Sequence, residues 1–234
     1  RPGAGPAPRG AVSGEARTGG GGGGGAAPAA AALHEPIDDF AAFGVRALTT
    51  TRAAGSFSMH GDDPVGAVTA RWAALREETG KGGARRLATA AQVHGARVVV
   101  HAADWEGWLR VDAADGHAAT ERGTAMAVTV ADCVPVFIAH PGGATALLHS
   151  GWRGTVARIV ERGVEALAQR GVPASELHVH LGPAICGKCY EVSPEVFGQL
   201  TGRAVERPTT VDLRAVIADH ARAAGVRHLS ISPL

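Results

Sequence analysis

Residues 136–170 read VFIAHPGGATALLHSGWRGTVARIVERGVEALAQR, and this stretch indicates the fold class most directly. Two short apolar runs, residues 136–139 and 144–148, flank a Pro-Gly-Gly sequence that is typical of a turn between strands. Residues 155–170 then place apolar side chains at helical spacing and end before Gly171, a common helix stop. A strand, a turn, a second strand and a helix are therefore predicted in succession.

Strand and helix patterns alternate on both sides of this stretch. The further predicted strands are residues 45–50, 86–93, 96–101, 125–130, 177–181 and 226–231. A helix is predicted to begin at Pro64 with Asp63 as its N-cap, and others begin at Ser193 and span residues 212–224. Because strands and helices are mixed throughout without an internal repeat, the pattern favours a single α/β (α+β) domain.

The composition limits the classes of partner. The chain has 234 residues, is 45% hydrophobic and carries a net charge of +1. No basic run alternates with aromatic residues, so we expect no nucleic-acid partner. No apolar stretch is long enough to cross a bilayer, so no membrane partner is expected. The chain contains three cysteines, an odd number, which favours a reducing, cytoplasmic compartment over a disulfide-stapled secreted fold.

The N-terminal segment differs from the rest in composition. Residues 1–36 are rich in Gly, Ala and Pro and include a run of glycines at residues 19–25. Such a segment cannot bury enough apolar surface to offset its chain entropy, so we predict a flexible tail. The catalytic domain is predicted to span residues 37–234.

Three reactive side chains stand at or near the ends of predicted strands. They are His94, Cys133 and His149. Loops at strand ends are where α/β proteins place their sites. Two imidazoles and a thiolate supply three of the four ligands that zinc takes, and an open fourth position is typical of a catalytic site. Copper accepts the same ligand types. Asp132 could orient an imidazole or hold a water molecule.

Simpler interpretations stay open for these residues. Cys133 also fits a small core residue, and His94 also fits a turn residue. The segment after His149 combines small residues with the start of a helix, which attracts anions, and Arg153 matches the shape of a phosphate. The alternative is that Gly151 and its neighbours only shape a strand-to-helix turn.

The remaining thiols and imidazoles give weaker signals. Cys186 and Cys189 are half of a zinc-ribbon motif without a second pair, so a redox pair or two thiols near a pocket or in the core fit better. His178 and His180 are predicted on the exposed face of a strand. The six other histidines that lack an evident partner are predicted on the surface: His60, His101, His117, His140, His220 and His228.

Four motifs in fixed order resemble the laccase-domain family, whose members carry the labels polyphenol oxidase, peptidoglycan editing factor and purine nucleoside phosphorylase. The motifs are QVHG at residues 92–95, ADCVPV at 131–136, HSGWRGT at 149–155 and LGPAICGKCYEV at 181–192. The resemblance runs from about residue 47 to the end of the chain. It implies a single domain with a four-layer α-β-β-α sandwich. It also implies that His94, Cys133 and His149 are metal-binding catalytic residues.

The resemblance further implies an activity: zinc-dependent phosphorolysis of purine nucleosides with adenosine deamination, and methylthioadenosine as a further substrate. Arg153 and Arg52 are then expected to hold phosphate, and Gln92 and Asp132 to lie against the substrate. Three alternatives remain. They are a copper-dependent polyphenol oxidase, a cysteine-type hydrolase of peptidoglycan precursors with Cys133 as nucleophile, and a binding domain without activity. The oxidase fits poorly because the chain has a single His-x-His pattern.

The chain also departs from the family's usual pattern. The loop at residues 55–59 is short, and the Asn-Leu segment that usually precedes the Gly-Asp-Asp-Pro helix start is missing. The chain stops at Pro233-Leu234, where members usually continue with a Cys-containing stretch and an Arg-rich segment. A truncated or divergent C-terminus of the catalytic domain is therefore expected.

Overall fold

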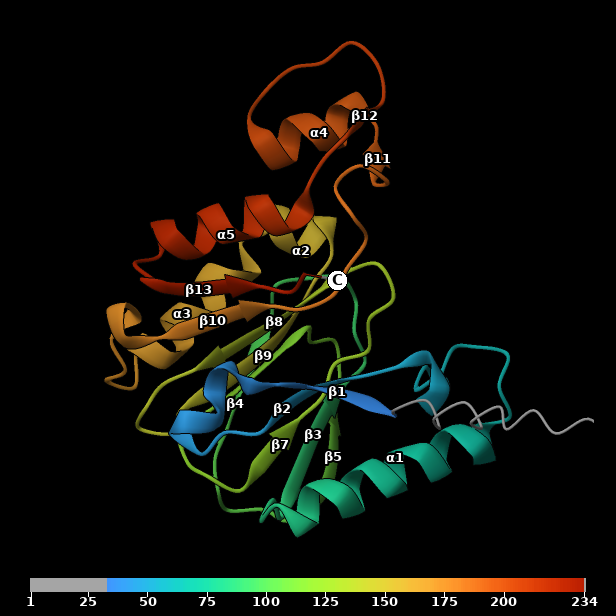
Figure 1. The fold of residues 1–234 in the computed structure, drawn as a ribbon, viewed down its shortest axis with the longest axis vertical. Coiled ribbons are helices and arrows are strands. Elements are labelled where there is room, and N and C mark those ends of the chain that lie inside the picture. Colours follow the sequence, from blue (N-terminus) through green and yellow to red (C-terminus); the bar gives the residue numbers. More distant parts are fainter. Residues whose placement is uncertain (1–32, 234) are drawn as a thin grey trace, which may run out of the picture. The chain divides into compact units, whose positions relative to one another are not determined.

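The computed structural model describes residues 33–233, which belong to one compact unit spanning residues 32–234 (Figure 1). Most of the predicted flexible tail, residues 1–36, lies outside the described residues. Its last residues enter strand β1 (His34–Ile37), which pairs antiparallel with β2 (Ala47–Thr50).

A six-stranded mixed sheet forms the centre of this unit. Its order is β13 (His228–Ile231), β10 (His178–Leu181), β8 (Val134–Ala139), β9 (Thr145–Ser150), β6 (Gly116–Ala119) and β4 (Val98–His101). The predicted hairpin between β8 and β9 is confirmed, and its turn closes through a hydrogen bond from the Gly143 N–H to the His140 carbonyl. Gly143 has a φ of 97°, a left-handed conformation that a residue with a Cβ rarely adopts.

Helices α3 (Ile159–Ala168) and α5 (Leu213–Ala223) cover one face of this sheet (Figure 1). Their apolar sides bury Ile159, Leu167 and Ile217 among the large side chains of the core. At Gly163 an added Cβ would lie 2.8 Å from Leu148 Cδ1, so the missing side chain lets α3 approach β9 closely.

The predicted helix over residues 155–170 is broken into two helices, α2 (Trp152–Val156) and α3. Between them Arg158 adopts a left-handed conformation with a φ of 62°, which ends the first helix and turns the chain. The prediction of one continuous helix was therefore wrong. The predicted apolar stripe of this segment is confirmed, because most of its side chains are buried in the core.

A second sheet lies on the other side of the six-stranded one. It consists of three parallel strands in the order β5 (Gly107–Val111), β3 (Arg86–Ala90) and β7 (Thr124–Met126). Helix α1 (Val65–Lys81) packs on it through Val68 and Trp72, which contact Leu87. The layers thus run helix, sheet, sheet, helices (Figure 1), which confirms the predicted α-β-β-α arrangement.

Helix starts were predicted with mixed success. Ser193 caps α4 (Pro194–Thr201), and Asp212 caps α5 by accepting from two backbone N–H groups. For α1 the prediction was wrong, because Pro64 occupies the N-cap position and the Asp63 carboxylate instead pairs with Arg71.

The remaining elements complete the unit. They are the two-stranded pair β11 (Glu191–Val192) and β12 (Thr209–Thr210) and the 3-10 turns Asp38–Phe43, Arg52–Ala54 and Ala174–Glu176. Within residues 33–233, no helix is both long and apolar enough to cross a bilayer.

Candidate metal centre

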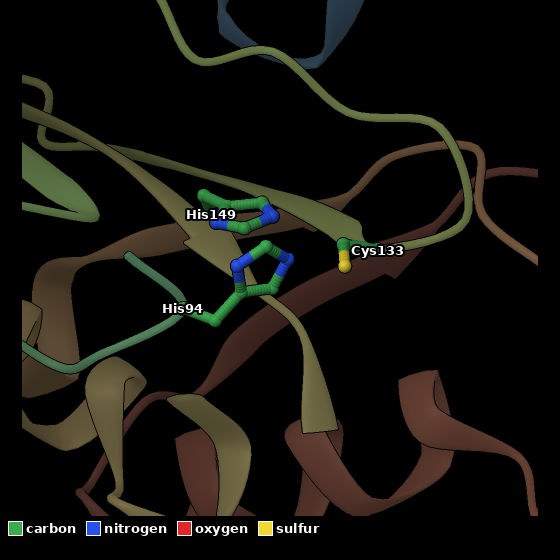
Figure 2. A group of neighbouring side chains, drawn as sticks. All are labelled: His94, Cys133 and His149. Carbon is green, nitrogen blue, oxygen red and sulfur yellow. The ribbon is translucent and has the colours of Figure 1, made fainter. Parts of the chain in front are cut away.

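The structure brings His94, Cys133 and His149 together at one edge of the space between the two sheets. His94 lies in the loop after β3, Cys133 directly precedes β8, and His149 lies within β9. One nitrogen of each imidazole and the Cys133 thiol all lie within 4.8 Å of one another. In Figure 2 the three side chains point toward a common point. Cys133 was expected at the end of a strand, but it stands at the start of one.

A buried carboxylate fixes the loop that carries His94. Asp115 has no exposed surface, and its oxygens accept the backbone N–H groups of three consecutive residues: Val93 at 3.2 Å, His94 at 2.9 Å and Gly95 at 2.8 Å. His94 has a φ of 59°, so the loop curls its N–H groups inward in the manner of an anion-binding nest. The loop conformation therefore depends on this one carboxylate.

The same carboxylate orients the second histidine. Asp115 Oδ1 lies 2.8 Å from His149 Nδ1, and His149 is only 3% exposed. This bond leaves Nε2 of His149 available on the side of the other two ligands. A metal-binding imidazole usually has such an outer partner, which fixes its orientation and raises its basicity.

The electrostatics of the centre favour the charged forms of both His149 and Asp115. Burial by itself lowers the pKa of His149, but the hydrogen bonds to Asp115 and to the Cys133 thiol outweigh it and raise that pKa to about 9. Burial likewise raises the pKa of Asp115, yet its bonds to His149 and to the N–H groups of Gly95 and Val93 bring that pKa below its ordinary value. Without a metal, His149 is therefore protonated at neutral pH, and a metal ion must displace that proton.

The residues present fit a metal ion with an open coordination position. Two imidazole nitrogens and one thiol sulfur are a donor set that suits zinc and also copper. Gly151 makes the close grouping feasible, because an added Cβ there would lie 2.8 Å from Cys133 Sγ and 3.2 Å from His94 Cδ2. Three protein ligands leave a fourth position for water or substrate.

The candidate centre opens on a cavity of ≈ 1080 Å³ whose lining includes His94, Cys133 and His149. Two of the predicted substrate residues, Arg52 and Asp132, also line it. A ligand of nucleoside size fits within a cavity of this volume. A smaller pocket of ≈ 200 Å³ shares His94 and is lined by Gln92 and Trp108.

The other two predicted substrate residues, Gln92 and Arg153, do not line the larger cavity. The Gln92 amide is engaged with Thr129, donating to its carbonyl at 2.8 Å and accepting from its N–H at 2.7 Å, so this side chain joins two segments of the chain. The Arg153 guanidinium stacks on the Trp152 ring at 4.4 Å, and the residue is exposed and lines neither pocket.

Sequence reasoning missed two residues of this region. Asp115 lies in the run DAAD with a second acidic residue, Asp112, and its only sequence signal is its place directly before a short strand. Tyr190 is the other: burial raises its pKa, and the negative charges of Cys133 and Asp132 raise it further while Arg153 opposes them. Its hydroxyl therefore titrates within the electrostatic reach of the centre.

Several histidines predicted on the surface are buried. His101 and His117 are paired at 2.9 Å between ring nitrogens, His180 bonds Ser230 at 2.9 Å, and His220 lies near Glu161. The surface prediction was wrong for these four because other layers or segments cover the strand and helix faces that carry them. Both Cys186 and Cys189 are exposed, so the core alternative for these thiols was also wrong.

The chain belongs to the family described as multi-copper polyphenol oxidoreductase laccase, whose pattern matches residues 46–234. A relative from Mycobacterium tuberculosis strain H37Rv named purine nucleoside phosphorylase is 36% identical over 210 residues, 81% of each chain. A Streptomyces coelicolor protein of the same name is 44% identical over 137 residues, which is 58% of this chain and 55% of the relative. The match thus spans about half the length of the Streptomyces relative. Adenosine deaminase RL5 of an unknown prokaryote is 37% identical over 117 residues, 45% of each chain.

Solved structures share the fold. The Bacillus licheniformis protein YfiH superposes with a TM-score of 0.75 at 19% identity, covering 87% of this chain and 86% of that one. YlmD of Geobacillus stearothermophilus has a TM-score of 0.69 at 27% identity, covering 76% of this chain and 73% of that one. The family match over residues 46–234 confirms the resemblance carried by the four motifs, and these structures confirm the fold.

Proposed function

We propose that the chain is a zinc-dependent purine nucleoside phosphorylase that also deaminates adenosine and cleaves methylthioadenosine. The observation that carries the proposal is the His94–Cys133–His149 group at the wall of the ≈ 1080 Å³ cavity. The names of the relatives supply the substrate class. A zinc ion held there would supply a Lewis acid that lowers the pKa of a water molecule toward neutrality.

The chain's own residues provide positioning and charge. His94, Cys133 and His149 would hold the metal, and Asp115 keeps Nε2 of His149 directed toward it. Arg52 puts a permanent positive charge on the cavity wall, which favours a phosphate dianion over a neutral ligand.

In the proposed phosphorolysis a phosphate oxygen forms a bond to ribose C1′ while the bond from C1′ to the purine nitrogen breaks. The bonding electron pair leaves with the base, which takes up a proton. Asp132 lies at the cavity wall, where its carboxylate can accept a hydrogen bond from a substrate hydroxyl or amino group.

The proposal is tested by metal content and turnover on the same samples. Wild type, Cys133→Ala and the matched control Cys189→Ala are purified under reducing conditions, analysed for metals by mass spectrometry, and incubated with adenosine, inosine and methylthioadenosine with and without phosphate. We expect near-stoichiometric zinc and phosphate-dependent base release in wild type and control, and loss of both in Cys133→Ala. Wild-type protein that binds neither metal nor nucleoside would refute the proposal. Stoichiometric copper with catechol oxidation would instead support the oxidase.

A second candidate rests on the hydrogen bond between Cys133 and the His149 imidazole, an arrangement that activates thiol nucleophiles. It is a cysteine-type hydrolase of peptidoglycan precursors. This alternative predicts cleavage that needs no phosphate, survives chelation of metal and is abolished by iodoacetamide. The zinc-dependent reaction fails under chelation, so the two candidates separate in one assay.

A further inference from the structure

The turn at Cys186-Gly187-Lys188-Cys189 brings two exposed thiols together outside the candidate metal centre. The Cys186 and Cys189 sulfurs lie 2.7 Å apart, and both cysteines are free. The turn is closed by two backbone hydrogen bonds, because the N–H groups of Cys189 and Tyr190 both donate to the Cys186 carbonyl at 2.9 and 3.1 Å. The two sulfurs are thus held within reach of each other by the backbone.

The turn is also seated against the body of the domain. At Gly187 an added Cβ would lie 2.6 Å from Asp212 Cβ, so the backbone of the turn packs directly on the residue that caps α5. On the other side the Ile185 N–H donates to the Asp132 carbonyl at 3.1 Å. These contacts restrict the turn, so little further conformational freedom would be lost when the sulfurs join.

The two thiols are chemically unequal. The hydrogen bond with Cys189, followed by the backbone N–H of Lys188, lowers the pKa of Cys186. The same contact with Cys186 raises the pKa of Cys189. Since the thiolate is the nucleophile in exchange reactions, Cys186 is the sulfur prepared to attack and Cys189 the one that follows.

We propose that Cys186 and Cys189 form a thiol–disulfide exchange site that accepts a disulfide-bearing oxidant, either a low-molecular-weight disulfide or a protein disulfide. The Cys186 thiolate attacks one sulfur of the oxidant, forming a mixed disulfide and expelling the other sulfur as a thiolate. Cys189 loses its proton to solvent, attacks the Cys186 sulfur and expels the second thiolate. Two cysteines are oxidised and one disulfide is reduced to two thiols.

A structural metal site is the main competing use of such a pair. A closed zinc site needs four protein ligands. Among residues 33–233, the groups of three or more potential ligands do not include either cysteine. Two exposed thiols without further potential ligands therefore favour thiol–disulfide exchange over a structural zinc site. This inference is independent of the proposed nucleoside chemistry.

The turn that carries Cys186 and Cys189 lies next to the chain segment that carries Cys133. The Ile185 N–H, directly before Cys186, donates a hydrogen bond to the carbonyl of Asp132, which directly precedes Cys133. Tyr190, next to Cys189, lies within electrostatic reach of Cys133. Cys133 itself is half-buried and bonded to His149, so we expect it to stay out of the exchange.

The test uses the wild-type chain of 234 residues, equilibrated in buffers of increasing oxidised-to-reduced glutathione ratio, then quenched with iodoacetamide and digested with trypsin. Trypsin cleaves after Lys188, between the two cysteines, so an internal disulfide appears as peptides 171–188 and 189–203 linked together. We expect this linked pair to replace the two alkylated peptides as the ratio rises, while Cys133 enters no disulfide. Cys133→Ser should behave like wild type.

The single variants give a second readout that does not depend on the linked peptide. Cys189→Ser should stop at the mixed disulfide and accumulate one glutathione on Cys186. Under limiting iodoacetamide, Cys186 in wild type should be alkylated several-fold faster than Cys189. Glutathione on both cysteines without a link, a link to Cys133, or equal alkylation rates would each overturn the proposal.

Discussion

Two buried histidines on the same central sheet have opposite acid–base character. His149 on β9 is 3% exposed and has a pKa raised to about 9, whereas His117 on β6 is 0% exposed and has a pKa lowered to about 3. Burial disfavours the charged imidazolium at both sites. His149 differs because it shares hydrogen bonds with Asp115 and Cys133, whereas His117 is paired with the His101 imidazole and feels the Asp115 charge without a hydrogen bond to it, so burial and His101 outweigh that charge. A bonded carboxylate thus converts a buried histidine from a neutral packing residue into a charged ligand candidate.

The largest expected effect comes from removing the carboxylate. Asp115→Ala leaves a buried imidazolium and three backbone N–H groups without their acceptor, so we expect a loss of about 3–5 kcal/mol in the free energy of unfolding. Asp115→Asn keeps the shape and should weaken zinc binding by about 10–100-fold. Urea denaturation and zinc titration provide the measurements.

Asp112→Ala is the matched control, because this exposed aspartate lies three residues earlier. It should change the unfolding free energy by no more than about 0.5 kcal/mol. If Asp115→Ala changed the unfolding free energy as little as Asp112→Ala, the Asp115 carboxylate could not be what distinguishes His149 from His117.

The second effect concerns acid stability and His117. Its folded-state pKa is lowered to about 3, so between pH 6.5 and 3 the unfolded chain binds a proton that the folded chain does not. Stability contributed by this histidine is therefore present above pH 6.5 and lost as the pH falls. As the pH falls from 6.5 to 5, the free energy of unfolding should therefore drop by about 2 kcal/mol less in His117→Asn than in wild type. Parallel stability curves for the two proteins would show that His117 titrates normally.

The third effect is the opposite pH dependence at the metal centre. Because the pKa of His149 is raised to about 9, protons compete with a metal for this imidazole at all lower pH values. Zinc affinity should rise by at least about tenfold per pH unit below pH 9, which corresponds to about 1.4 kcal/mol, and a proton lost from the Cys133 thiol steepens this slope. Competition with a chelating dye at pH 6.5, 7.5 and 8.5 measures this slope once the dye's own protonation is corrected. A zinc affinity unchanged over this range would contradict the assignment of His149 as a protonated ligand.

Local signals were enough for much of the fold. The β8–β9 hairpin follows from a glycine turn between apolar runs, and the starts of α4 and α5 follow from Ser193 and Asp212, whose side chains are short acceptors. The break at Arg158 could not be seen, since neither it nor Ala157 opposes a helix and the apolar spacing continues past them. Tertiary packing, which buries the side chains of α3 against the sheet, favours the turned path there.

The candidate site was predictable only through motifs. His94, Cys133 and His149 are far apart in the chain, so no spacing rule brings them together, and the four ordered motifs supplied the grouping. Asp115 was missed because a second aspartate, Asp112, lies three residues before it, and no local pattern shows which of the two is buried at the site. Gln92 stays a predicted substrate residue that lines the smaller pocket with His94, and its amide also bonds Thr129, a contact between two distant segments that the sequence does not reveal.

The double use of Asp115 has a kinetic consequence for any bound ion. Asp115 holds both histidines of the candidate centre, His94 through its loop backbone and His149 through its ring. The His149 ring cannot turn away while that carboxylate stays in place, and its release would also free the backbone of the His94 loop, so a bound ion would lose support from both segments in one step. We expect its residence time to be set by a single local opening in which Asp115 releases the loop and the imidazole together.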